Sequence, residues 1–551
     1  MLKMMVFSFV LFLLSLMFMF FGFFLMMENK FYVFEWMIYG FNSMKMNFIL
    51  MINFKLMMFV FLVMLISSVI MFYSASYMDL SDKFYVNRFY YLMMLFLMSM
   101  IFLILSPNML TLLLGWDGLG LISYCLIIFY QKKLAFNSGM LTIILNRLGD
   151  SSLLMIISFM TIFGSWNLIL YEFNMLILLM FFLMVFTKSA QLMFMIWLPA
   201  AMMAPTPVSS LVHSSTLVTA GIYLLINYES LIELKYKMYI LMISSMTMLI
   251  SGIMANFEMD FKKIIALSTL SQLGFMMSIY SLGMVNLTFL HLFIHAFFKS
   301  MMFMCAGSFI HYMMGIQNFR FYLGAYYLYP LKGLLLLLSL LMLSGFPFLV
   351  GYYSKDLIIE HYFLNVMSIF SVMNLILGTI FTVSYSTRIL MLMFKSNYKL
   401  ILFYMGDDVF MTKSIVFIKL IMIYMSKLVH DFFFFELDMN LIKVYKYFVF
   451  KMILLGILLS YIFNNININN ESLIFMKSFF LMEYLYKFIL NHSMGKFISY
   501  ELFLEKGLME KLTGKMMCFV NEVMKFKGWT VVIMTYLLIM YIYMFLVMLF
   551  I

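Results

Sequence analysis

Apolar stretches of about 20 residues recur along the whole chain, separated by short segments in which charges, prolines and glycines gather. A helix of that length spans the hydrocarbon core of a lipid bilayer. The pattern predicts an all-α polytopic membrane protein with about fifteen transmembrane helices. We expect them at residues 4–27, 48–73, 88–106, 108–130, 135–160, 173–198, 208–228, 237–256, 262–282, 286–311, 328–362, 366–394, 411–426, 447–464 and 530–551.

Two of these predicted helices contain breaks. The span 328–362 is too long for one straight crossing, and Gly345-Phe346-Pro347 interrupts it. Proline removes a backbone hydrogen bond, so the freed groups must face protein or water rather than lipid. The span 173–198 is expected to be irregular in the same way around Lys188-Ser189-Ala190-Gln191.

The segment from about Lys496 to Lys527 has a different pattern, because charges interleave with apolar residues at helical steps. This predicts a long amphipathic helix lying along a surface, followed by a final apolar anchor from Val531 to Ile551. The periodicity leaves two interpretations open: a helix resting on the bilayer, or a brace against partner subunits.

Composition supports the membrane assignment. Of 551 residues, 66% are hydrophobic and 11% charged, which excludes soluble and disordered classes. The first segment has no cleavage site of small residues and is expected to be a retained helix. The 67 Met, 66 Phe and 36 Tyr against 25 Gly indicate coding by an A/T-rich organelle genome. The net charge of +11 fits loop lysines near anionic lipid, and no basic cluster suggests nucleic-acid binding.

Ionisable residues inside the predicted helices are the candidates for function, because a charge at the bilayer centre costs about 2.5–3.5 kcal/mol. Asp117 lies among glycines in Gly115-Trp116-Asp117-Gly118-Leu119-Gly120, which permits close helix packing around a carboxylate. Arg147 and Asp150 stand three residues apart and can pair on one helix face. A purely structural salt bridge is the alternative for all three.

Lysine and histidine provide groups that can exchange protons. Lys188 is the only cation in a long apolar helix, and snorkelling to the interface is the alternative. His291, His295 and Lys299 recur every four residues, so they share a stripe of about 12 Å along one helix. The stripe predicts a proton path rather than a metal site, because no acidic residue completes a zinc motif.

Three further residues lie near special segments. Lys355 and Asp356 follow the Pro347 break by two turns, where Lys355 could titrate while Asp356 partly compensates its charge. His213 lies among serines and threonines that could orient water, with a packing role as the alternative. The three cysteines are far apart, so no disulfide framework, haem or iron–sulfur site is expected.

Several of these segments together resemble the antiporter-like subunits of respiratory complex I. The resemblance covers roughly residues 85–395. The predicted broken helix, long lateral helix and last anchor of this chain are similar to those of the distal member of that family. The motifs that carry it are Trp116–Tyr124, Thr187–Gln191, Trp197–Thr216, Lys262–Gly274, His295–Lys299 and Ser354–Asp356.

The resemblance implies an inverted pair of five-helix repeats, each with a discontinuous helix. It places N-terminal helices at 1–84, the first repeat at 85–230 and the second at 235–395. C-terminal helices and loops follow at 396–490, the lateral helix at 491–528 and the anchor at 529–551.

The resemblance also implies residue roles in a chain of charges along the membrane plane. Asp117 takes the acidic partner role, although the family often has Glu there. Lys188 and Lys299 correspond to the two central lysines, and Lys355 to the terminal lysine. The remaining candidates correspond to relay, gating or supporting positions: His213, His291, His295, Arg147, Asp150 and Asp356.

The function implied is proton translocation in the membrane arm of NADH:ubiquinone oxidoreductase, in the mitochondrial inner membrane. NADH, FMN, iron–sulfur clusters and ubiquinone would be bound by other subunits, with no cofactor or metal in this chain. Expected partners are other membrane-arm subunits, including antiporter-like neighbours contacted by the lateral helix, and membrane lipids. The alternatives are an Mrp-type cation/proton antiporter subunit and a purely structural membrane subunit.

Overall fold

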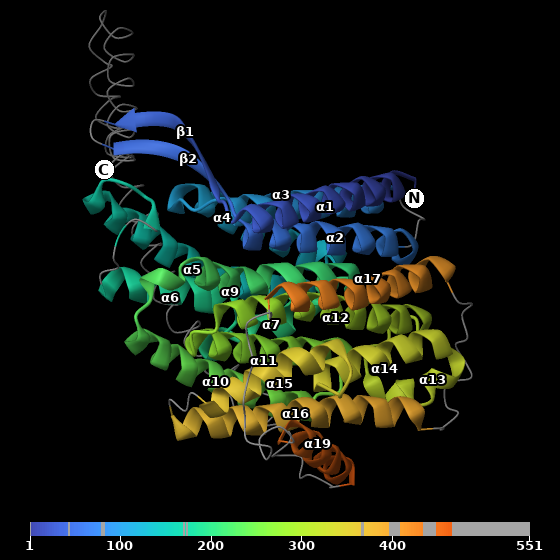
Figure 1. The fold of residues 1–551 in the computed structure, drawn as a ribbon. Coiled ribbons are helices and arrows are strands. Elements are labelled where there is room, and N and C mark those ends of the chain that lie inside the picture. Colours follow the sequence, from blue (N-terminus) through green and yellow to red (C-terminus); the bar gives the residue numbers. More distant parts are fainter. Residues whose placement is uncertain are drawn as a thin grey trace, which may run out of the picture. The chain divides into compact units, whose positions relative to one another are not determined.

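The computed structural model describes residues 2–41, 44–78, 83–168, 171, 175–364, 368–395, 408–433 and 448–465. Within them, long helices lie side by side and a β-hairpin stands at one end of the bundle (Figure 1). The predicted lateral helix at 491–528 and the anchor at 529–551 lie outside the described residues. The brace therefore stays a prediction.

The first half of the described chain contains a hairpin, seven long helices and several short ones. The long elements are α1 (Leu2–Glu28), β1 (Tyr32–Phe41), β2 (Met44–Ile52), α2 (Phe54–Tyr77), α3 (Lys83–Leu105), α4 (Met109–Ile127), α5 (Lys133–Met160), α6 (Met175–Lys188) and α9 (Leu217–Asn227). The short ones are η1 (Ile128–Tyr130), η2 (Thr161–Phe163), η4 (Leu192–Phe194), α7 (Trp197–Ala200), η5 (Ala201–Met203), α8 (Thr206–Val208), η6 (Ser209–Thr216) and η7 (Glu229–Leu231).

The second half is helical throughout the described residues. Its elements are α10 (Leu234–Phe257), α11 (Phe261–Ser281), α12 (Val285–Tyr312), η8 (Phe319–Tyr322), α13 (Ala325–Leu328), α14 (Pro330–Ser344), α15 (Val350–Leu364), α16 (Ile369–Phe394), α17 (Val409–Phe433) and α19 (Phe448–Asn465).

The predicted class of helical membrane protein is confirmed. Ten of the described helices are long and apolar enough to cross a membrane, or eleven if the bent pair Met175–Lys188 and Leu192–Met203 is one span. Two shorter apolar helices, Pro330–Ser344 and Phe448–Phe463, accompany them. The predicted total of about fifteen includes a span outside the described residues and stays a prediction.

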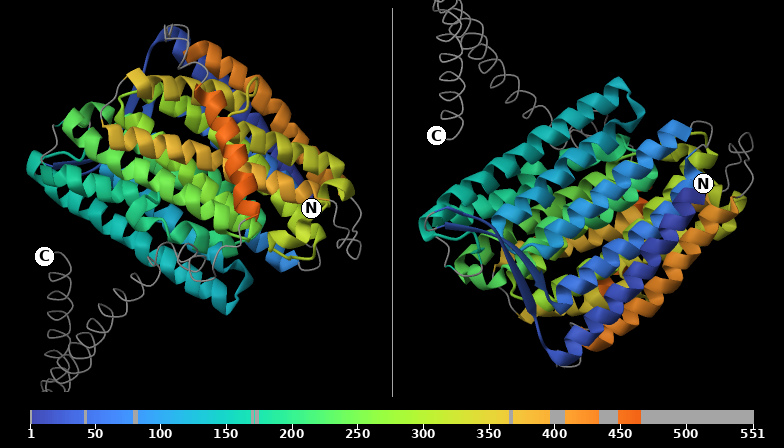
Figure 2. Two further views of the ribbon diagram at one scale, coloured as in Figure 1. Left: turned by 90° about the horizontal axis from the view of Figure 1, so that it is seen from below. Right: turned by 90° about the horizontal axis from the view of Figure 1, so that it is seen from above.

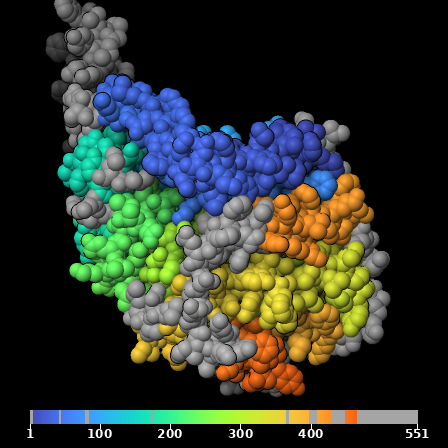
Figure 3. Space-filling model, viewed as in Figure 1, coloured from blue at the N-terminus to red at the C-terminus, as the bar shows by residue number. Residues whose placement is uncertain are grey.

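The β-hairpin is the exception to the all-helical pattern. β1 and β2 pair antiparallel, beginning with Tyr32 opposite Ile52. Aromatic residues favour strands and stabilise them by pairing across the hairpin, as Trp36 does with Phe48 at a ring distance of 6.1 Å. Figure 3 shows this part of the chain on the surface, standing away from the packed helices.

The hairpin corrects one predicted boundary. Hydropathy predicts a helix at 48–73, but residues 44–52 form β2 and the helix begins at Phe54. Both segments are strongly apolar, so hydropathy alone does not separate the end of the strand from the start of the helix.

α11 and α12 form the interior of the bundle, since their most apolar windows are entirely buried. α12 packs against α2, α11, α14 and α17. On the outside, α19 lies across α16 (Figure 2). A polar side chain on the inner faces of α11 and α12 therefore contacts protein rather than lipid, which makes these helices the natural location for a buried polar path.

Candidate functional site

The first predicted break is confirmed and gives Lys188 its position. α6 ends at Lys188, Ala190 adopts a left-handed backbone conformation with φ +51°, and helix resumes at Leu192. The two helical parts differ in direction by 45°. Lys188 is thus placed in the last turn of a half-helix, where the backbone carbonyls favour a cation.

The second predicted break is confirmed as well. α14 ends at Ser344, Gly345 has φ +78°, and α15 begins at Val350. The Nζ of Lys355 donates to the carbonyl of Leu343 in the last turn of α14. At both broken helices, a lysine therefore lies at the C-terminal end of the first half-helix, where backbone carbonyls are unpaired. This is the pattern expected for a cation held inside a membrane.

Close packing at the second break requires glycine. A Cβ at Gly351 would overlap the carbonyl oxygen of Met342, so only glycine lets α15 start against the end of α14. Asp356 follows on the same helix and interacts with the hydroxyl of Tyr352 one turn earlier. The carboxylate therefore has a partner on its own helix.

His213 lies in a π-helical segment that the sequence analysis did not predict. Residues Ser209–Thr216 form this segment, and His213 is buried within it. Ser214 and Thr216 donate to backbone carbonyls of this segment, and Ser210 donates to the Pro207 carbonyl of α8, rather than to the imidazole. Within the described part of the chain, neither ring nitrogen of His213 has a hydrogen-bond partner. Single π-helical turns often occur at functional sites.

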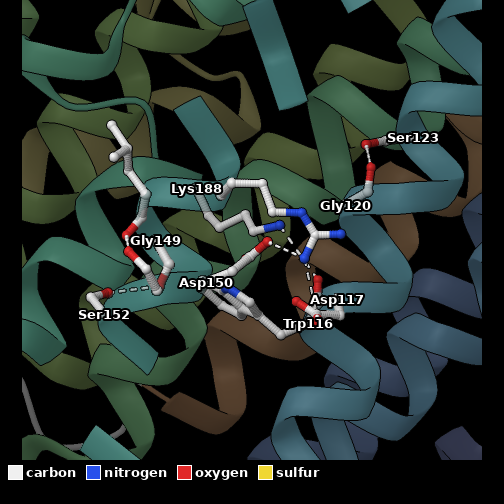
Figure 4. A network of polar contacts seen from close by, with 11 residues as sticks. Trp116, Asp117, Gly120, Ser123, Gly149, Asp150, Ser152 and Lys188 are labelled. Atoms are coloured by element: carbon white, nitrogen blue, oxygen red, sulfur yellow. Dashed lines mark hydrogen bonds and ion pairs between the residues drawn. The ribbon is translucent and has the colours of Figure 1, made fainter. Parts of the chain in front are cut away.

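The structure brings Asp117 of α4, Asp150 of α5 and Lys188 of α6 together (Figure 4). Arg147 of α5 joins them through its ion pairs. Arg147 is the centre of the ion pairs: its Nη1 lies 3.6 Å from Asp117 and 3.4 Å from Asp150. The predicted pair of Arg147 with Asp150 is confirmed. Among the described residues, the ion-pair partner of Asp117 is Arg147.

Lys188 is held by the backbone and ring of Trp116. Its Nζ donates to the Trp116 carbonyl oxygen at 3.4 Å and lies 5.1 Å from the centre of the indole ring. The side chain is 1% exposed. Both Asp150 and Asp117 are close enough to interact electrostatically with the ammonium group. The lysine is therefore buried inside the cluster and does not snorkel to an interface.

Glycines make the space for this cluster, as the sequence predicts for the Asp117 segment. A Cβ at Gly115 would lie 2.6 Å from the backbone nitrogen of Leu103, so α3 and α4 approach closely there. A Cβ at Gly120 would lie 3.3 Å from the Nζ of Lys188. Small residues at these positions bring the helix backbones and the lysine into contact.

The second cluster is the stripe on α12, where His291, His295 and Lys299 are all completely buried. The Nζ of Lys299 donates to the Ser268 hydroxyl of α11 at 2.5 Å. His295 packs edge-on against Phe298, and neither of its ring nitrogens has a hydrogen-bond partner within the described residues. The stripe geometry is confirmed, and its proton-carrying role stays a prediction.

The two nitrogens of His291 bond to different helices. Nδ1 lies 3.0 Å from the Ser354 hydroxyl of α15, and Nε2 lies 3.2 Å from the Oε1 of Gln272 on α11. Ser354 precedes Lys355 in the chain. His291 therefore connects the helix that carries the terminal lysine with the helix that binds Lys299.

Sequence reasoning missed the uncharged residues of this cluster and several buried lysines, Lys262 and Lys332 among them. Ser268 and Gln272 carry a usable signal, since they stand four apart on one face of a buried helix. Lys262 donates to the Ala204 carbonyl at 3.0 Å, and Lys332 donates to the Tyr312 hydroxyl. Both lysines fall near predicted helix ends, where hydropathy gives no reason to single them out.

Comparisons with known proteins agree with these features. A family model described as NADH:quinone oxidoreductase/Mrp antiporter, TM, matches residues 106–382. The chain is 51% identical to the NADH-ubiquinone oxidoreductase chain 5 of Apis mellifera ligustica over 440 residues, which cover 80% of this chain and 79% of that relative. The chain belongs to the NADH:quinone oxidoreductase/Mrp antiporter family. The chain 5 protein of Aedes aegypti is a further relative, 42% identical over 86% of this chain and 82% of its own length.

A solved structure shares the fold of this family member. The Mrp complex from a Dietzia species contains a chain that superposes with a TM-score of 0.76 at 20% identity. The match covers 94% of this chain and 59% of that one. The predicted resemblance is thus confirmed. The matched family region contains all ten candidate residues, from Asp117 to Asp356.

Proposed function

We propose that this chain is a proton-translocating membrane-arm subunit of NADH:ubiquinone oxidoreductase, located in the mitochondrial inner membrane. The 51% identity to a protein named NADH-ubiquinone oxidoreductase chain 5, over 80% of this chain, is the observation that carries the proposal. NADH oxidation and ubiquinone reduction take place in other subunits, which bind the FMN and iron–sulfur clusters. This chain itself needs no redox centre for its part in the reaction.

The cluster around Lys188 is proposed to load and release the proton. A carboxylate that approaches an amine stabilises its ammonium form, and its withdrawal favours release of the proton. Arg147 competes with Lys188 for Asp117 and Asp150, because it pairs with both carboxylates. A movement of Arg147 would therefore change the electrostatic environment of Lys188, so that the lysine amine binds or releases a proton.

The stripe on α12 and the second break are proposed to carry the proton onward. Lys299 receives it next to the Ser268 hydroxyl, with His291 and His295 as relay or gating groups. Lys355 ends the path at the break between α14 and α15. In this proposal His213, Asp356 and the ion pair of Arg147 with Asp150 support the path by positioning water and charge.

The proposed partners are the other subunits of the membrane arm. Residues 491–528 are proposed to lie along neighbouring antiporter-like subunits as a lateral brace, and membrane lipids cover the remaining surface. An Mrp-type cation/proton antiporter subunit is the second candidate, favoured by the shared fold of the Dietzia chain. The two differ in the energy source, since only the first depends on NADH.

The deciding experiment measures proton uptake by liposomes that contain the purified assembly. If the proposal holds, NADH with a quinone drives proton uptake, and Lys188→Met or Lys299→Met abolishes it without loss of assembly. If this chain purifies without NADH-oxidising activity and exchanges cations for protons across a pH gradient, the antiporter proposal replaces it.

A further inference from the structure

His291 is held by two hydrogen bonds that come from opposite sides of its ring. Nδ1 contacts Ser354 of α15 at 3.0 Å, and Nε2 contacts Gln272 of α11 at 3.2 Å. All three side chains are completely buried. The ring therefore cannot exchange its partners for bulk water, so these two contacts determine its protonation pattern.

Gln272 belongs to a polar face of α11. Ser268, Ser271 and Gln272 stand at positions i, i+3 and i+4 and therefore point the same way. They face Tyr385 of α16: the Ser271 and Tyr385 hydroxyls lie 3.3 Å apart. Tyr385 also interacts with the side chains of Gln272 and Ser268. One buried tyrosine hydroxyl thus contacts both the partner of His291 and the serine that binds Lys299.

The orientation of the Gln272 amide determines which imidazole tautomer is stable. A neutral imidazole has one donor and one acceptor nitrogen. When the amide oxygen faces the ring, the ring proton lies on Nε2, and Nδ1 accepts from the Ser354 hydroxyl. When the amide is turned over, its nitrogen donates to Nε2 and the ring proton lies on Nδ1. The Tyr385 hydroxyl interacts with the Gln272 side chain and can hold the amide in one of these two orientations.

We propose that Gln272, held by Tyr385, is a positioning residue that sets the tautomer of His291 and so decides which side of the ring can accept the next proton. With the proton on Nε2, the lone pair that can accept a further proton is on Nδ1 and faces the helix of Lys355. With the proton on Nδ1, it faces α11, where Ser268 binds Lys299. The inference rests on the proposed function and adds two uncharged residues to it.

The charges that act on the ring come from two helices. Lys355 belongs to α15, and Lys299 and His295 belong to α12. On α11 the ring contacts the uncharged Gln272 and packs edge-on against Phe275, and Tyr385 of α16 interacts with Gln272. Because the lysines remain in place, Gln272→Met and Tyr385→Phe change the contacts that set the tautomer without changing a charge.

The experiment uses the whole assembly in liposomes and measures NADH-driven proton uptake over a range of pH. Gln272→Met removes both polar atoms and is expected to slow uptake about tenfold, the value of one lost buried hydrogen bond. Tyr385→Phe leaves Gln272 in place and is expected to slow uptake about threefold. Gln272→Glu keeps the acceptor and is expected to restore uptake partly, with its pH dependence moved to higher pH because a carboxylate stabilises the imidazolium.

Tyr280→Phe is the matched control. Tyr280 lies on the same helix as Gln272 and is fully buried, but within the described residues its hydroxyl has no hydrogen-bond partner. Its variant is expected to pump at the wild-type rate with an unchanged pH profile. A comparable loss in the control would show that tyrosine removal merely disturbs packing and would overturn the inference.

Lys299→Met in the same series separates this inference from the proposed function. If Lys299→Met pumps at the wild-type rate, the proposed function itself fails. If Lys299→Met is inactive while Gln272→Met and Tyr385→Phe pump normally and keep the wild-type pH profile, only the tautomer proposal is refuted. Equal losses in Gln272→Met and Gln272→Glu with no shift in pH dependence would also refute it.

Discussion

Replacing Lys188 by methionine tests the centre of the proposed path. Methionine has about the length of lysine and suits a buried position, and Lys188 is 1% exposed. The substitution removes the hydrogen bond to Trp116, worth about 1 kcal/mol, but it also removes the cost of burying a cation. Asp117 and Asp150 keep Arg147 as their partner. Assembly and thermal stability are therefore expected to remain close to those of the wild type.

Proton transfer, in contrast, is expected to fall by about two orders of magnitude. Without the amine, a proton must pass this position with no group to bind it, and a charge in the membrane interior costs about 2.5–3.5 kcal/mol. Added to the barrier, this amount corresponds to a rate roughly 70- to 400-fold lower. Coupling should then slow quinone-dependent NADH oxidation as well.

The assay is NADH-driven acidification of liposomes that contain the purified complex, with NADH oxidation measured in parallel. Lys237→Met is the matched control, because Lys237 is also a buried lysine but pairs with Glu229 at 3.4 Å, away from the cluster. We expect the control to pump within about twofold of the wild type, since it removes an ion pair at the edge of the bundle. An assembled Lys188→Met complex that pumps at more than half the wild-type rate would remove Lys188 from the path.

Three further predictions follow from the cluster and the chain ends. Asp117→Glu should be tolerated and Asp117→Asn should slow pumping more than about tenfold, because only the first keeps the charge that faces Arg147; equal rates would contradict this. In double-mutant cycles on pumping rate, Asp117→Asn should couple more strongly with Arg147→Gln than with Lys188→Met, and additivity within the Arg147 pair would be the contrary result. Truncation before Lys496 should abolish stable assembly on native gels, since it removes the predicted brace; a fully assembled complex would show the brace to be dispensable.

Much of the fold could be predicted from the sequence, because a bilayer limits the choice to apolar helices. Both helix breaks were also predictable: a proline two residues after a glycine, and a lysine followed by polar residues, are conspicuous in apolar segments. The hairpin was not predictable from hydropathy, since residues 48–52 are as apolar as the helix that follows. The π-helical segment around His213 was equally hidden, because it changes hydrogen-bond spacing without changing composition.

The charged half of the site was predictable and its pairing was not. Because a charged side chain in the membrane interior costs free energy, the sequence alone singles out four residues of this cluster: Asp117, Arg147, Asp150 and Lys188. Which carboxylate pairs with which cation depends on how α4, α5 and α6 are rotated against each other, and that rotation is a result of packing. The glycines of α4 indicate close contact, but they do not say that Arg147 rather than Lys188 reaches Asp117.

Uncharged polar residues are the part of the site that sequence reasoning undervalues, and there is a physical reason for it. A lysine in an apolar segment is improbable enough to attract notice, whereas serine and threonine are common in membrane helices because they can bond to their own backbone. Ser271 does so with Ser268, yet it also reaches Tyr385 across two helices. Gln272 cannot satisfy its amide in this way and must find a partner on another helix, which is His291. A buried glutamine in an apolar helix is therefore as informative about the location of a polar site as a buried lysine. Its amide needs a hydrogen-bond partner on a neighbouring helix, so its position fixes which two helices pack together around the polar group between them.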